Sequence, residues 1–186
     1  MIFGIGLGRT GTRSLTEALC LMGFKAVHWD DRGQHVLDRW YESEVCLPTD
    51  LDAFIEGPFV RWWRMADRLY PGSRFILTTR DKSEWLASVE RWMKRNNPQS
   101  GDEWFHRRLL FWGTTRFHRE LFSAAWDEHH ETVSQYFADR TDLLVLDIAA
   151  TPPAALWSAL SHFTGRAAPN VPFPHRNQSR KGVVPK

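Results

Sequence analysis

Cysteine is scarce in this chain, which has only Cys20 and Cys46 among its 186 residues. Their spacing fits neither a zinc site nor the disulfide framework of a small secreted domain. Long apolar runs are also missing, so no stretch predicts a membrane-spanning helix. The sequence begins directly with an apolar strand pattern, so we expect no signal peptide. These absences together predict a cytoplasmic protein that is not inserted in a membrane.

Neither sign of charge dominates, because 24 lysines and arginines are balanced by 22 aspartates and glutamates, for a formal net charge of +2. This balance does not favour a nucleic-acid binder. Hydrophobic residues make up 42% of the chain, and its length suffices for one α/β core. We expect a single domain over residues 1–166. A proline-rich, basic tail over residues 167–186 belongs to the same domain and is expected to be loosely packed or ordered on binding.

Strand and helix patterns alternate along the chain. Short apolar strands are predicted at residues 2–6, 24–29, 74–79 and 143–146, with a further apolar stretch at 51–56. Helices are predicted after the first strand and at residues 31–41, 59–69, 81–95, 102–112, 115–138 and 153–163. This alternation predicts an α/β fold, a three-layer sandwich with a central parallel sheet. Its ligands should bind at the carboxyl ends of the strands.

The loop between the first strand and the first helix has the composition of a phosphate site. Glycines at positions 4, 6, 8 and 11 allow the backbone to approach an anion closely. A strand, a glycine loop and a helix start together direct backbone N–H groups at such an anion. Arg9 adds a positive charge, and Thr10, Thr12 and Ser14 add hydroxyl donors.

Three kinds of nucleotide site compete for this loop. In the NTPase pattern G-x-x-x-x-G-K-[ST], Thr12 stands where lysine should be, so an ATP or GTP hydrolase is disfavoured. The residues from Gly6 to Gly11 satisfy the dinucleotide pattern G-x-G-x-x-G, and Asp30 lies where a ribose-binding acid is expected. A small NAD(P)-binding protein is therefore one alternative. A relative that binds a nucleotide without catalysis is another.

A second site is predicted where the strand at residues 74–79 ends. Arg80 leaves this strand at the ligand edge, and Ser88 lies two turns into the following helix, so both can contact one phosphate. The alternative for Arg80 is an ordinary ion pair with Asp81 or Glu84. In the same helix, Trp85 shares one face with other apolar residues, as expected for the core.

These motifs resemble the sulfotransferase family that uses 3′-phosphoadenosine 5′-phosphosulfate (PAPS). The run from Gly8 to Leu15, Gly-Arg-Thr-Gly-Thr-Arg-Ser-Leu, is similar to that family's 5′-phosphosulfate loop. Thr79-Arg80-Asp81 with Ser88 is similar to its 3′-phosphate motif. The resemblance extends to the segments 70–80 and 171–177, and so covers almost the whole chain, most closely the short bacterial-type members.

The resemblance implies the fold of P-loop nucleotide kinases, with PAPS as sulfuryl donor and 3′-phosphoadenosine 5′-phosphate (PAP) as product. The acceptor would be a hydroxyl or amine of a small molecule or glycan. The implied donor-binding residues are Gly8, Arg9, Thr10, Gly11, Thr12, Arg13, Ser14, Arg80 and Ser88. Arg180-Lys181-Gly182 resembles the segment that closes over the 3′-phosphate, although a solvated basic tail explains it equally well.

Catalysis by such a site needs positioning, charge stabilisation and a proton acceptor. Arg9 stands where many relatives place lysine, and its role would be electrostatic because arginine does not act as an acid. Glu56 is the first choice for the general base, with His28 and Asp30 as rivals. The adjacent His129 and His130 are expected on a solvated helix face, and no histidine spacing indicates a metal site.

Overall fold

The structure, a computed structural model, describes residues 1–28, 47, 50–96 and 103–176. At its centre is a five-stranded sheet with the strand order β2-β3-β1-β4-β5. Its strands are β1 (Ile2–Gly4), β2 (Ala26–His28), β3 (Ala53–Ile55), β4 (Arg74–Thr79) and β5 (Leu143–Asp147). Every neighbouring pair is parallel, so all carboxyl ends lie at one edge. The predicted parallel α/β fold is confirmed.

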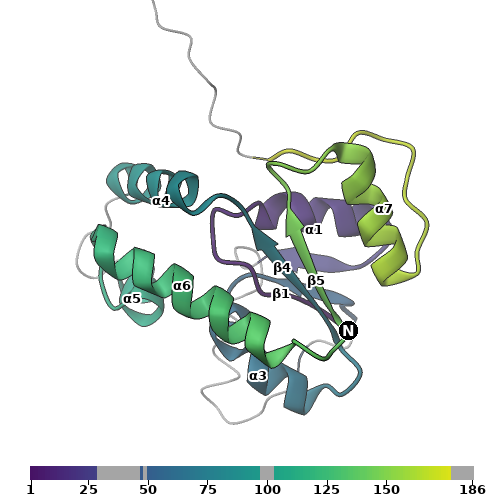
Figure 1. Ribbon diagram of the computed structural model, residues 1–186, viewed down its shortest axis with the longest axis horizontal. Coiled ribbons are helices and arrows are strands. Elements are labelled where there is room, and N and C mark those ends of the chain that lie inside the picture. Colours follow the sequence, from purple (N-terminus) through teal and green to yellow (C-terminus); the bar gives the residue numbers. More distant parts are fainter. Residues whose placement is uncertain (29–46, 48–49, 97–102, 177–186) are drawn as a thin grey trace, which may run out of the picture.

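Helices cover both faces of the sheet, as Figure 1 shows. They are α1 (Thr12–Leu21), α3 (Phe59–Leu69), α4 (Lys82–Arg95), α5 (Glu103–Trp112), α6 (Arg119–Tyr136) and α7 (Pro153–Thr164). The helices α1 and α7 pack on one face, and α3 and α6 pack on the other. A third apolar cluster joins α4 to α6 beyond the carboxyl edge of β1. The three layers are those predicted from the alternation of strands and helices.

Side chains of the central strands alternate between the two layers. In β1, Ile2 packs toward α1 and α7, whereas Phe3 packs toward α3 and α6. In β3, Phe54 contacts the α3 layer, and its neighbours Ala53 and Ile55 face the other way. Because successive strand residues point to opposite faces, short fully buried strands appear in the sequence as continuous apolar runs.

Several elements are shorter than their patterns predicted. The first strand ends at Gly4 rather than residue 6, and the second comprises Ala26–His28 only. A β-carbon on Gly6 would overlap the hydroxyl and backbone of Thr78, so the chain leaves β1 where only glycine fits beside β4. The helix predicted at 115–138 is α6, Arg119–Tyr136. The helix predicted at 31–41 lies outside the described residues.

The beginning of the C-terminal tail is packed onto the body of the protein. Phe173 is buried and its ring lies 4.9 Å from that of Trp157 on α7. The indole N–H of Trp157 also donates to the carbonyl of Val171 at 2.9 Å. Phe173 thus anchors the tail to the body of the protein, while most residues of 167–176 are exposed. The proline and basic content of the tail does not indicate that an aromatic residue between two prolines packs into the core.

Within the described ranges, every helix is too short or too polar to cross a lipid bilayer.

Candidate functional site

The glycine-rich loop after β1 is held in place by contacts with α4 and β4. The indole N–H of Trp85, which is fully buried, donates to the carbonyl of Gly8 at 2.9 Å. The buried hydroxyl of Thr10 donates to the Leu7 carbonyl and pairs with the hydroxyl of Thr78, both at 2.6 Å. These bonds fix the loop's shape independently of any ligand.

The loop ends at the N-terminus of α1. Gly11 is the N-cap and has a left-handed φ of 101°, and a β-carbon there would press on Ile148 at 3.1 Å. No side chain caps this helix, and its first turn contains no acidic residue. The backbone N–H groups of the first turn and the positive end of the helix dipole together attract anions to this point.

Arg9 extends the positive charge of this helix end toward α4. Its φ is 77°, a left-handed conformation uncommon for residues other than glycine. Its Nε donates to the hydroxyl of Ser88 at 3.4 Å, and its carbonyl accepts from Nη1 of Arg80 at 3.3 Å. The structure therefore brings the two predicted phosphate motifs together: Arg9 of the glycine loop lies beside Arg80 and Ser88 of the β4–α4 junction.

The electrostatic surroundings of Arg9 are unusually positive. Its pKa is lowered, first by burial and then by the charge of Arg95. The carboxylate of Glu56 opposes this shift, while Arg80 and Arg91 add to it. Mutual repulsion among these guanidinium groups favours the binding of an anion beside them.

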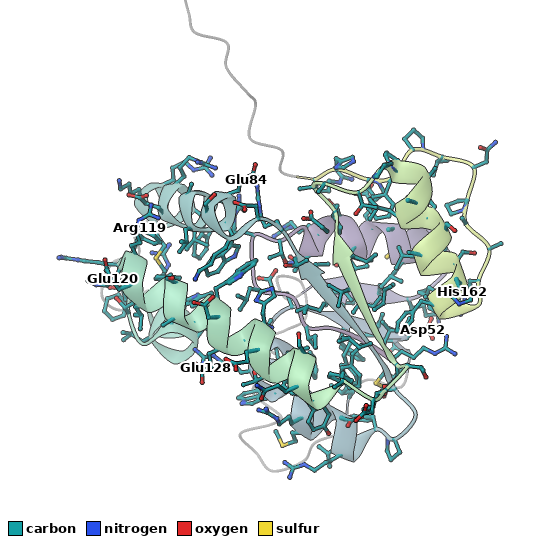
Figure 2. The ribbon with its side chains drawn as sticks, in the orientation of Figure 1. Asp52, Glu84, Arg119, Glu120, Glu128 and His162 are labelled. Carbon is teal, nitrogen blue, oxygen red and sulfur yellow. The ribbon has the colours of Figure 1, made fainter. Side chains whose placement is uncertain are left out.

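Arg80 forms the ion pair that the sequence analysis gave as its alternative role, and it also contacts the glycine loop. Its Nη2 pairs with Glu84 at 2.6 Å, while Nη1 reaches the loop carbonyl of Arg9. Asp81 caps α4 by accepting from the backbone N–H of Glu84 at 2.9 Å. Figure 2 shows Glu84 at the start of α4, close to the end of β4. The Nε of Arg80 is buried and has no hydrogen-bond acceptor among the described residues.

Glu56, His28 and Thr12 form a compact cluster on the opposite side of the loop. The Glu56 carboxylate oxygen Oε2 accepts a short hydrogen bond from the Thr12 hydroxyl and lies 3.1 Å from Nε2 of His28. A β-carbon on Gly8 would come within 3.1 Å of the other oxygen, Oε1, which therefore faces the loop. Glu56 has a φ of 67°, again left-handed.

The protonation of this cluster follows from its contacts. Burial opposes ionisation of Glu56, but hydrogen bonds from His28 and Thr12, with the charges of His28 and Arg13, outweigh it and lower the Glu56 pKa. An ionised carboxylate only accepts hydrogen bonds, so His28 must carry its proton on Nε2. That nitrogen therefore cannot take a proton from a substrate while it donates to Glu56.

The remaining loop residues differ in their surroundings. The buried hydroxyl of Ser14 accepts from the backbone N–H of Arg176 at 2.9 Å, which leaves its own proton free to be donated. Arg13 is exposed at the first turn of α1. Asp30, Arg180 and Lys181 lie outside the described residues.

His129 and His130 do not lie on a solvated helix face, so that prediction is wrong. Nε2 of His129 donates to the carbonyl of Ile5 at 2.9 Å. His130 donates from Nδ1 to the Trp126 carbonyl at 2.9 Å, and its Nε2 lies 3.1 Å from the Thr79 hydroxyl. These bonds tie α6 to the carboxyl ends of β1 and β4. Sequence reasoning missed both histidines and the indole of Trp85, since no local pattern marks a helix side chain that bonds a distant loop.

The half-buried His129 predicts a pH-dependent stability. Burial lowers its pKa from 6.5 to about 4. The folded protein therefore holds this histidine neutral, and its contribution is complete above pH 6.5 and is lost as the pH falls toward about 4. His129→Gln, which keeps an N–H donor but does not titrate, should lose less stability between pH 7 and pH 5 than the wild type. Denaturant titrations at both pH values measure this.

The control is His162→Gln, on the exposed side of α7 (Figure 2). It should follow the wild-type pH profile. A His129→Gln profile that also superimposes on the wild type would contradict the role of the half-buried imidazole.

The order of the strands in the sheet argues against the NAD(P)-binding alternative. In dinucleotide-binding sheets the second strand pairs with the first, which places the acid after β2 beside the loop. Here β3 lies between β2 and β1, so a residue after β2 starts about 10 Å from β1. The carboxylate next to the glycine loop comes instead from Glu56, after β3.

Comparison with known proteins agrees with this geometry. The family model described as Sulfotransferase domain matches residues 1–181, nearly the whole chain. None of the curated proteins compared with the chain matches it.

Proposed function

The chain belongs to the sulfotransferase domain family, and on that premise we propose that it transfers the sulfuryl group of PAPS to a hydroxyl or amine of its acceptor. Family membership makes it a sulfuryl-transfer enzyme and agrees with the resemblance of its motifs. The observation that carries the choice of donor is the convergence of Arg9, Arg80 and Ser88 beside the uncapped start of α1. PAPS has two separate anionic groups, and this site has two sets of donors.

In this proposal the two ends of the donor are bound by different elements. The N–H groups at the start of α1, with the hydroxyl of Ser14, bind the 5′-phosphosulfate. Arg80 and Ser88 bind the 3′-phosphate. Arg9 lies between the two sets and stabilises the negative charge that develops on the leaving phosphate oxygen. Thr10, whose hydroxyl is engaged within the loop, maintains the loop's shape.

The transfer itself needs one proton acceptor. The acceptor oxygen or nitrogen forms a bond to sulfur while the bond from sulfur to the phosphate oxygen breaks, and PAP departs. The acceptor's proton passes to Glu56, whose Oε1 faces the loop while Oε2 is held by Thr12 and His28. His28 then acts as a positioning residue. We also expect the enzyme to work in the cytoplasm, which stays a prediction.

Ligand-dependent melting tests the choice of donor. A ligand that binds only the folded state stabilises it by about 2.7 kcal/mol at 100 times its Kd. For a chain of this size such a gain raises Tm by roughly 5–10 °C. PAP should produce a shift of this order, whereas NADH at the same concentration should not.

ATP serves as the second comparison, because it tests the NTPase alternative. Stabilisation by NADH equal to or greater than that by PAP would reject PAPS as donor. Strong stabilisation by PAP without transfer to a broad panel of phenolic, sugar and lipid alcohols would favour a binding protein over an enzyme.

A further inference from the structure

One face of α4 continues the predicted 3′-phosphate site away from the loop. Ser88, Arg91 and Arg95 are spaced by three and four residues, so they lie on the same side of the helix. Ser88 is buried against Arg9, while the two arginines are exposed. This face therefore starts at Ser88 of the phosphate motif and continues with the guanidinium groups of Arg91 and Arg95.

Helix geometry places Arg95 on the face of α4 that contains Ser88. Seven residues separate it from Ser88, a rise of about 10 Å along the axis. Side chains of a helix lean toward its N-terminus, so the long Arg95 side chain can extend back toward Ser88 and the loop. In agreement, Arg95 has a larger electrostatic effect on the pKa of Arg9 than Arg80 has.

Other cations near α4 have carboxylate partners. Lys94 pairs with Glu90 at 2.8 Å, Lys82 pairs with Asp127 at 2.6 Å, and Arg80 pairs with Glu84 at 2.6 Å. Among the residues that the structure describes, Arg91 and Arg95 have no such partner. A guanidinium that lies near other guanidinium groups and has no carboxylate partner is suited to an anion with more than one charge.

We propose that Arg95 is a donor-binding residue that contacts the 3′-phosphate of PAPS together with Arg80 and Ser88. This inference rests on the proposed function. The phosphate of a 3′-monoester has up to two charges and three free oxygens, more than Arg80 and one hydroxyl can satisfy. Arg91, one turn nearer Ser88 but with a weaker effect on Arg9, makes a smaller contribution.

The test compares two ligands that differ only by the 3′-phosphate, namely PAP and adenosine 5′-phosphate. Calorimetry on the full chain measures both Kd values for the wild type, Arg95→Ala and Arg95→Gln. We expect each variant to weaken PAP by about 10-fold or more, as for a lost charged hydrogen bond. Adenosine 5′-phosphate should change less than about 2-fold, and Arg91→Ala should show a smaller version of the same selective loss.

Lys94→Ala is the matched control, because it removes a positive charge from the adjacent position of the same helix turn. It should leave both Kd values close to wild type. If Arg80→Ala weakens PAP but neither Arg95 variant does, this inference is wrong while the proposed donor stands. If the Arg95 variants weaken both ligands equally, Arg95 does not contact the 3′-phosphate. A wild type that does not prefer PAP over adenosine 5′-phosphate would reject the proposed donor and this inference together.

Discussion

Turnover with PAPS should fall by about two to four orders of magnitude when Glu56 is replaced by glutamine, the usual contribution of a positioned general base. Glutamine preserves the shape of the side chain and can still accept the hydrogen bonds of Thr12 and His28, but it cannot take the acceptor's proton. The affinity for PAP and the fold should therefore stay close to wild type. Single-turnover rates with labelled PAPS and an acceptor from the screened panel measure the loss.

Glu128→Gln is the control for this variant, since Glu128 is an exposed carboxylate on α6 (Figure 2). It should be as active as the wild type. Full activity in Glu56→Gln would transfer the role of base to His28 or Asp30. The pH profile adds a second measurement: the hydrogen bonds from His28 and Thr12 outweigh burial and lower the Glu56 pKa, so the carboxylate is ionised at neutral pH, and kcat/KM should decline through this group only in acid, below the usual range of a glutamate.

Arg80→Ala should weaken PAP by about 10- to 150-fold, which corresponds to the 1.5–3 kcal/mol of a hydrogen bond to a charged group. Adenosine 5′-phosphate, which lacks the 3′-phosphate, should lose far less. In the free protein the buried Nε of Arg80 has no acceptor among the described residues. Competition binding with both nucleotides measures the difference.

Glu84→Gln distinguishes this role from the ordinary ion pair. It breaks the contact with Arg80 but removes a negative charge from the site, so PAP affinity should be kept or improved. A variant that loses PAP affinity as severely as Arg80→Ala would show that the ion pair, rather than the phosphate, explains the effect of Arg80.

Those parts of the site that depend on neighbouring residues could be predicted from the sequence. The β4–α4 junction is an example: an apolar strand, the N-cap Asp81 and a hydroxyl two turns on are all local features. The glycine loop is another, because Gly6 and Gly11 stand where a side chain would collide with Thr78 or Ile148. In both cases the capping or steric requirement applies to the same residues that make the motif recognisable in the sequence.

Contacts between distant segments could not be predicted in the same way. Glu56, His28 and Thr12 come from three elements, and they meet because β3 is inserted between β2 and β1. Strand order depends on how whole layers pack, and no short stretch of sequence specifies it. His129 is similar, since its contact with Ile5 spans 124 positions.

The backbone conformations of Arg9 and Glu56 limit how far the thermal stability of this protein can be raised without loss of activity. In the part of the chain that the structure describes, they are the two residues other than glycine with a positive φ. Such a conformation is unfavourable by about 1–3 kcal/mol, and glycine would relieve it. Selection for heat resistance alone should therefore favour glycine at positions 9 and 56, and would remove the proposed electrostatic group and the proposed base together. Stabilised variants of this enzyme need to be selected for turnover at the same time.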